Sequence, residues 1–345
     1  MALAASMPVK DRIYVSSENI ASEESMRGLY ERWYALYRRD DDPSEKEKRF
    51  GIFKAEARAV YELNEGNERV KHHLNLFADM TQDEYAEGFT NCSPLQIQPR
   101  DEIKLNFHQP SQYYPDNLPL YVDWRDVDDV LTSVKTQGNC GSCWAIAATG
   151  AMESIHFLKN NKRTNLSIQE LVDCSPSPNM GCDGGKASKA FQYVIKKHGI
   201  HSSEQYPYVG NGSHCTTPSG SRVMSIKSYH FVHRCNEKLL MDAVGHAPVV
   251  VAVLGSNTTE YKRYSGGIFR GPCNGTGGHQ ALLVGYGTTR SDDANNPGIK
   301  YWVVKNSWGE SWGERGYLRI ERGHQADGGL CGIMLHHSVY PVDPK

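Results

Sequence analysis

The chain has 345 residues, enough to bury a large core and to form two or three domains. Its 39% hydrophobic and 23% charged residues are typical of an ordinary soluble protein, and a formal net charge of −2 gives no electrostatic reason to propose nucleic acid or a membrane surface as a partner. No stretch approaches the roughly 18 uninterrupted apolar residues that a membrane-spanning helix needs.

Residues 1–21 are expected to be an N-terminal tail or a truncated signal remnant. Met1–Pro8 reads like the end of a secretory signal peptide, but it is too short to hold a charged region followed by an apolar one. A cytosolic protein therefore stays the alternative.

Residues 22–90 are charged, and their apolar residues recur at helical spacing. Ser44 with Glu47, and Thr81 with Glu84, have the spacing of capping boxes. The pattern predicts two helices, with apolar faces formed by Met26, Leu29, Tyr30, Trp33, Leu36 and Tyr37 in the first and by Phe50, Phe53, Ala57, Val60 and Asn64 in the second.

Residues 91–117 lose this periodicity and are rich in proline, which predicts a linker or processing segment. Residues 118–345 are richer in glycine and cysteine and form a second predicted domain. Helices are expected there from Cys143, Ser167, Ala187 and Asn236, followed by strands at 248–254, 280–287, 300–304 and 316–320. Helices followed by strands indicate the α+β class.

Cys143 stands where a helix is predicted to begin, with Ser142 as the expected N-cap. The unpaired N–H groups and the dipole of a helix N-terminus favour a negative charge, so a thiol placed there is more readily the nucleophilic thiolate. The segment therefore looks suited to present an activated sulfur.

A thiolate nucleophile needs a base, and the base needs an orienting group. His279, between glycines and a predicted strand, is the best base among the histidines, and Asn306 is the best orienting amide. Trp308 could keep water from their bond. Gln137 and the backbone N–H of Cys143 could form an oxyanion hole.

Simpler readings exist for each of these residues. Cys143 could be a structural thiol or half of a Cys-x-x-Cys pair with Cys140, which would suggest zinc or redox chemistry, but no second such pair follows. His279 could be an ordinary strand histidine, and Trp308 and Trp312 could belong to the core.

The motifs together resemble a papain-family cysteine endopeptidase in its zymogen form. The resemblance covers residues 25–341 and is carried by Cys140–Trp144, Asp123–Arg125, Gly181–Gly185, Asn306–Gly309 and, in the first ninety residues, Glu45–Asn64 and Asn75–Asp79. It implies a two-lobed fold with a helical left lobe and an antiparallel, β-barrel-like right lobe. It also implies that residues 22–90 are an inhibitory propeptide crossing the cleft, although His73 and Glu56 depart from the family pattern; an unrelated helical domain is the alternative.

The resemblance implies three disulfides, Cys140–Cys182, Cys174–Cys215 and Cys273–Cys331, with Cys92 and Cys235 left over. Disulfides indicate an oxidising compartment. Glycosylation acceptors stand at Asn165, Asn211, Asn257 and Asn274, each of which could be unused. We expect a protein of the secretory pathway, either extracellular or in a vacuole or lysosome.

The resemblance also implies the substrate-binding residues, which are Gly184, Gly185, Lys186, Ala187, Ala252, Gly278, Gln280, Trp308 and His336. Departures from the family cluster at its main specificity pocket, S2, where Lys186, Gln280 and His336 predict a more polar, narrower pocket that disfavours bulky aromatic residues. His336 would make this preference sensitive to pH. Lys186 could instead point into solvent, and Gly184 and Gly185 could be only a turn.

The expected reaction is peptide hydrolysis through an acyl-enzyme on Cys143, with no metal or organic cofactor. Expected partners are protein or peptide substrates, the chain's own propeptide and cystatin-type inhibitors, and the protein is expected to be a monomer. A peptide ligase on the same scaffold and a catalytically silent binding or inhibitory homologue are the alternatives.

Overall fold

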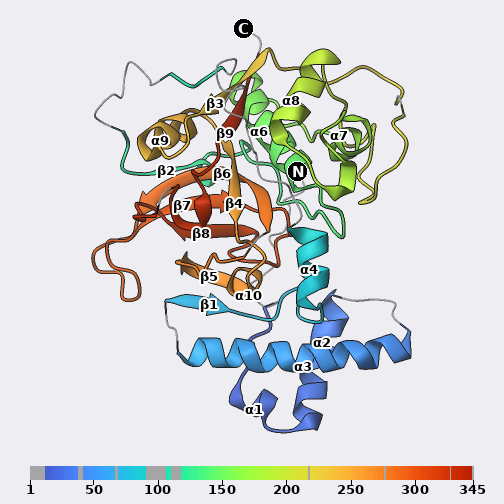
Figure 1. Cartoon of the computed structure of the whole chain (residues 1–345), viewed down its shortest axis with the longest axis vertical. Coiled ribbons are helices and arrows are strands. Elements are labelled where there is room, and N and C mark those ends of the chain that lie inside the picture. Colours follow the sequence, from blue (N-terminus) through green and yellow to red (C-terminus); the bar gives the residue numbers. More distant parts are fainter. Residues whose placement is uncertain are drawn as a thin grey trace.

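The computed structural model describes residues 12–37, 42–66, 69–90, 106–109, 118–216, 218–275, 277–326 and 328–343. A helical domain, residues 12–90, lies at one end of the molecule, and a larger domain, residues 118–343, places helices beside a sheet (Figure 1). The predicted α+β class is confirmed.

The helical domain is built on two crossing helices. Its elements are α1 (Ser17–Ile20), α2 (Glu23–Tyr37), α3 (Pro43–Glu65), β1 (Val70–His72) and α4 (Gln82–Phe89). Most of the predicted apolar faces of α2 and α3 form one buried cluster. Leu36 and Asn64 are the exceptions: 48% of the Leu36 surface is exposed, and the Asn64 side chain hydrogen-bonds the backbone of His72.

The predicted helix starts are partly confirmed. Thr81 and Glu84 form a capping box at α4, with both reciprocal hydrogen bonds present. The start predicted at Ser44 is wrong, because Asp42 is the N-cap of α3 and its side chain accepts a hydrogen bond from the Ser44 N–H. Pro43 then occupies the first helical position, where its missing N–H costs nothing.

The terminal segment before α1 contacts this domain. Ile13 pairs with Leu74, and Val15 is buried in the same cluster as α2 and α3. The domain boundaries at residues 21, 90 and 117 stay predictions.

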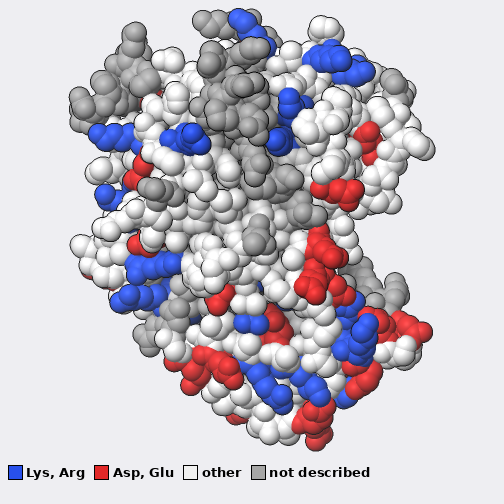
Figure 2. Space-filling model, in the orientation of Figure 1, with Lys and Arg blue, Asp and Glu red and all other residues white. Residues whose placement is uncertain are grey.

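The outer face of the helical domain carries acidic and basic side chains side by side (Figure 2). Several are paired between helices: Arg27 with Glu47, Lys46 with Glu31 and Lys54 with Glu23. These exposed pairs contribute little stability individually. The domain is therefore held mainly by its apolar cluster.

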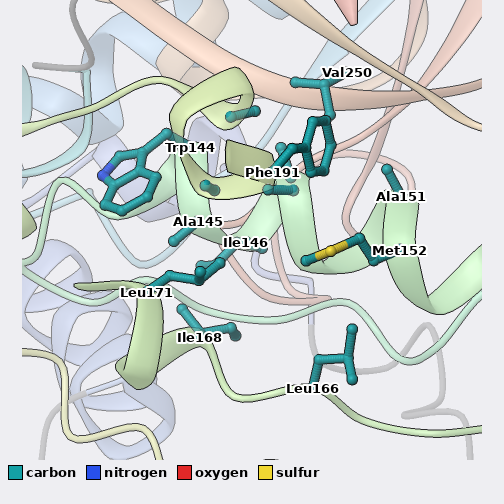
Figure 3. Close-up of a cluster of buried hydrophobic side chains, with 14 of the residues drawn as sticks. Trp144, Ala145, Ile146, Ala151, Met152, Leu166, Ile168, Leu171, Phe191 and Val250 are labelled. Carbon is teal, nitrogen blue, oxygen red and sulfur yellow. The ribbon is translucent and has the colours of Figure 1, made fainter. Parts of the chain in front are cut away.

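The described helices of the larger domain include one that is mostly buried. They are α6 (Cys143–Asn160), α7 (Ile168–Cys174), α8 (Ala187–Lys196), α9 (Glu237–His246) and α10 (Thr259–Arg263), with 3-10 turns η2 (Trp124–Asp126), η3 (Gly181–Asp183) and η4 (Leu330–Gly332). The first twelve residues of α6 are buried. Phe191 of α8 and Val250 of the sheet lie in the same cluster as α6 (Figure 3).

The strands form one largely antiparallel sheet. They are β2 (Val122–Asp123), β3 (Ser228–Val232), β4 (Val249–Leu254), β5 (Tyr264–Phe269), β6 (Gly278–Thr288), β7 (Lys300–Lys305), β8 (Tyr317–Glu321) and β9 (Ser338–Val342). Their order is β1-β5-β8-β7-β6-β4-β9-β3, with β2 beside β6, so among the described residues the barrel-like lobe is an open path rather than a closed barrel. β1 of the helical domain pairs with β5 and thereby joins the two domains.

Within the described residues, no helix is long and apolar enough to cross a membrane.

We expect Trp33→Ala to destabilise the helical domain by about 3–5 kcal/mol, because it removes a large buried side chain. Trp33 is fully buried, stacks on Tyr30 and donates a hydrogen bond to the Asn75 carbonyl at 2.8 Å. Leu36→Ala on the same helix is the control and should change the free energy of unfolding by no more than about 0.5 kcal/mol. Urea unfolding of the full chain measures both, and equal effects would contradict this account of the core.

Candidate active site

Cys143 is the first residue of α6 and is fully buried. Ser142 holds the N-cap position but makes no capping bond; its hydroxyl lies 2.6 Å from that of Tyr208 instead. The Cys143 Sγ accepts a hydrogen bond from the Gln280 N–H at 3.4 Å. Cys143 is disulfide-bonded in this structure rather than a thiol, so its sulfur has to be reduced before it can act as a nucleophile.

His279 and Asn306 are brought together by neighbouring strands of the sheet. His279 lies at the start of β6, and Asn306 directly follows β7, which pairs with β6. The His279 Nε2 lies 2.7 Å from the Asn306 Oδ1, and the Trp308 ring lies 4.9 Å from the imidazole, centroid to centroid. The amide therefore fixes the ring orientation while the indole covers it.

The imidazole of His279 is completely buried in this state. Burial lowers its pKa to about 4, against the opposing effects of the Asn306 hydrogen bond and the Phe89 backbone. The ring is therefore neutral above about pH 4, whereas a thiolate–imidazolium pair would need it charged. Phe89 belongs to the helical domain, and its backbone by itself raises the pKa, so burial is the cause that keeps the base neutral.

Gln137 is fully buried, and its side chain is held at both ends. Its Oε1 accepts a hydrogen bond from the Ser307 hydroxyl at 2.7 Å. Its Nε2 donates to the Cys140 carbonyl at 3.1 Å and to the Gly88 carbonyl of the helical domain at 3.3 Å. The amide that was predicted to polarise a substrate carbonyl therefore already holds a carbonyl of α4.

The sequence did not indicate that Ser307 would orient the Gln137 side chain, although Ser307 lies within the Asn306–Gly309 motif. Its bond to Gln137 spans 170 residues, and no local pattern signals it. The role of Tyr208 beside Ser142 was missed for the same reason.

The side chain of Gln280 connects the two lobes by hydrogen bonds to the backbone of Gly185 and Ala187. Its Nε2 donates to the Gly185 carbonyl at 2.6 Å, and its Oε1 accepts from the Ala187 N–H at 3.1 Å. Ala252 stands opposite Gln280 in the β4–β6 register. Gly185 itself packs against Trp144, because an added Cβ would lie 2.6 Å from the indole.

The structure places the remaining predicted pocket residues on several separate elements. Lys186 is the half-buried N-cap residue of α8, and burial lowers its pKa, with Lys189 adding to the effect. Gly184 adopts a φ of 108°, and Gly278 pairs with Leu254. His336 is half-buried between η4 and β9.

The structure contains the three disulfides that the resemblance implies. They are Cys140–Cys182, Cys174–Cys215 and Cys273–Cys331, and the first ties the loop before Cys143 to η3. Cys235 is free and exposed, and Cys92 lies outside the described residues. Asn165, Asn211 and Asn274 are exposed, whereas Asn257 is half-buried and its Oδ1 accepts from the Gly277 N–H.

Aromatic residues of the helical domain surround Trp308. The rings of Phe77, Tyr85 and Phe89 lie 5.3, 5.6 and 6.4 Å from the indole. The Tyr85 hydroxyl donates to the Ser256 carbonyl at 2.6 Å. This domain therefore covers the side of the site next to His279.

Polar contacts extend the interface along β1 and α3. Glu56 makes a two-pronged ion pair with Arg263, at 2.9 and 2.8 Å. His73 lies 3.1 Å from the Ser311 carbonyl, and burial lowers its pKa and that of His72 to about 4. The two residues that depart from the family pattern, Glu56 and His73, thus both contact the larger domain.

No group of histidine, cysteine or acidic side chains able to hold a metal ion occurs in the part of the chain that the structure describes.

Two family models match the chain. The model described as papain family cysteine protease matches residues 118–342, and the cathepsin propeptide inhibitor domain matches residues 30–85.

Similar proteins extend over nearly the whole chain. Cysteine endopeptidase RepA of Oryza sativa subsp. japonica is 39% identical over 95% of this chain and 88% of its own, and a vignain of Ricinus communis is 37% identical over 99% and 93%. Among solved structures, a recombinant stem bromelain precursor has a TM-score of 0.82 at 35% identity, covering 93% of this chain and 99% of its own. The proform of the ragweed pollen cysteine protease Amb a 11 has the same TM-score and identity, covering 97% and 99%.

Proposed function

The chain belongs to the papain family of cysteine proteases and is a zymogen with a propeptide inhibitor domain, and from this premise we propose that Cys143, His279, Asn306 and Gln137 carry its catalysis. The observation that carries the proposal is the 2.7 Å bond between His279 and Asn306 beside the N-terminus of the Cys143 helix. From here on, residues 12–90 are called the propeptide and residues 118–343 the peptidase domain.

In the proposed reaction the Cys143 thiolate attacks the carbonyl carbon of a peptide bond. The Gln137 amide and the Cys143 N–H stabilise the oxyanion, and the His279 imidazolium gives its proton to the leaving amine. The products of this step are an acyl-enzyme and a free amine. His279 then removes a proton from water, which attacks the thioester, releases the acid and returns the thiolate.

Two contacts explain how the propeptide would prevent this reaction. The Gly88 carbonyl occupies the Gln137 amide, and Tyr85 and Phe89 pack on Trp308, the ring that covers His279, so the oxyanion donor is occupied and the base is shielded from water. Removal of α4 would free both groups.

The test is a peptide-substrate assay after acid activation in a thiol reductant, which is needed because Cys143 is disulfide-bonded. We expect Cys143→Ala to abolish activity and Gln137→Ala to lower the rate by about 100- to 1,000-fold, the usual effect of losing one oxyanion donor. Gln325→Ala, at an exposed position, is the matched control.

Activity that survives Cys143→Ala would overturn the assignment. An added amine nucleophile separates hydrolysis from peptide ligation, since a ligase would give an extended peptide as its main product. A precursor that is processed but cleaves nothing would favour the catalytically silent homologue.

We propose that Gln280 makes the S2 pocket shallow and polar. Its side-chain amide hydrogen-bonds the Gly185 carbonyl and the Ala187 N–H. These two backbone groups lie next to the place where the family binds the second substrate residue, P2. Small or polar P2 residues would fit over this amide, whereas a phenylalanine would have to displace it. Lys186 and His336 are proposed to line the rim.

Replacing Gln280 with alanine should enlarge the pocket. We expect kcat/KM for a P2 phenylalanine substrate to rise about tenfold relative to a P2 alanine substrate, the scale of discrimination that apolar pocket contacts give. A peptide library scan measures the change, with Gln325→Ala as control. Strong preference for phenylalanine in the unaltered enzyme, independent of pH, would contradict the proposal.

We propose that buried histidines make propeptide release acid-dependent. His72, His73 and His279 have pKa values of about 4 in the zymogen, against 6.5 for the ordinary group. Release lets them bind protons more readily, so the closed state is favoured above pH 6.5 and loses stability as the pH falls from 6.5 toward 4.

Replacing His72 and His73 together with glutamine should lower the pH at half-maximal processing by roughly half a unit or more, because two of the proton-binding groups are lost. Processing is followed by electrophoresis across a pH series. His324→Gln, at an exposed position, should not move the midpoint. An unchanged midpoint in the double variant would exclude these histidines as the cause.

We propose that the protein follows the secretory pathway, to the extracellular space or to a vacuole or lysosome, because its three disulfides need an oxidising compartment. We also propose that the glycosylation acceptors are used, that cystatin-type proteins inhibit the enzyme and that the protein is a monomer.

A further inference from the structure

Residues 106–109 lie against a free edge of the sheet. β3 is the last strand in the sheet order, so one of its edges has no strand partner among the described strands. The Phe231 N–H donates to the Asn106 carbonyl at 2.8 Å, and the His108 N–H donates to the Phe231 carbonyl at 2.7 Å. The segment thus extends the sheet in the parallel direction, as peptides do when they bind at a sheet edge.

The side chain of Phe107 is held by two histidines. Its ring stacks on His233 with 3.9 Å between centroids and 6° between planes, and it meets the edge of His337 at 5.0 Å. The two imidazoles and Phe231 form a slot that suits an aromatic ring.

The side chain of His108 points into a buried polar site. Its Nε2 lies 2.9 Å from the Asp242 Oδ2, its Nδ1 lies 2.7 Å from the Tyr340 hydroxyl, and both His108 and Asp242 are 6% exposed. Two other titratable groups face the pair: His246, 3.6 Å from the other Asp242 oxygen, and His230, 3.5 Å from the Tyr340 hydroxyl.

Without His108 the buried carboxylate of Asp242 would lose a basic partner at 2.9 Å. A buried charge that loses its partner is costly. All of the contacts described above come from the peptidase domain, so the segment would not need the propeptide helices to stay in place.

We propose that the outer edge of β3, with Asp242, Tyr340 and His233, is a peptide-docking site of the peptidase domain. It takes an extended segment with an aromatic residue followed by a histidine, and its occupant is the chain's own Asn106–Gln109. The connection between propeptide and peptidase domain is therefore anchored at a second place, separate from the active-site cleft.

Hydrogen exchange on the full-length Cys143→Ala precursor tests the docking. This variant cannot process itself through Cys143, so the result does not depend on the proposed catalysis. We expect Phe107→Ala and His108→Ala each to speed exchange of the Phe231 amide by about tenfold or more, because this N–H loses its partner when the segment leaves. Gln109→Ala, at an exposed position of the same segment, should leave exchange unchanged.

Exchange in α6 serves as the folding reference for every variant. His108→Gln, which keeps a polar side chain of similar size, provides a second comparison if the alanine variant exchanges faster throughout. An undisturbed α6 together with unchanged exchange at Phe231 in both Phe107→Ala and His108→Gln would overturn the proposal.

Discussion

The packing around Trp308 is the contact on which the closed state of this zymogen depends. One face of the indole covers the imidazole of His279, and other sides meet Phe77, Tyr85 and Phe89 of the propeptide. The same apolar surface that would keep water from the His279–Asn306 bond in the enzyme therefore binds the inhibitor.

Burial connects this packing to electrostatics. An imidazole removed from water resists protonation, and so the propeptide would inhibit by disfavouring the imidazolium as well as by filling the cleft. His72 and His73 experience the same effect at the far end of the interface, beside the ion pair of Glu56 and Arg263. The propeptide's two departures from the family pattern, Glu56 and His73, thus lie where they can adjust how firmly the propeptide is held.

Several elements differed from the sequence prediction for identifiable reasons. α3 begins at Pro43 because Asp42 and proline form a start signal stronger than that of Ser44. Ser142 does not cap α6, because the Tyr208 hydroxyl lies close enough to bond its side chain. The strands β5 and β9 were not predicted: β5 contains Gly266 and Gly267, β9 contains Pro341, and neither has a regular alternation of apolar and polar residues.

The family, the α+β class, the helical propeptide and the residues proposed for catalysis could all be predicted from the amino-acid sequence, because they depend on local spacing and on residue types that the chemistry requires. The contacts of the individual polar side chains, in contrast, depend on the three-dimensional packing. Gln137 holds the Gly88 carbonyl, Gln280 joins Gly185 to Ala187, and His108 enters the site of Asp242. These bonds join residues from 49 to 134 positions apart in the chain. Contacts over such separations follow from how the elements pack and leave no periodic trace in the sequence.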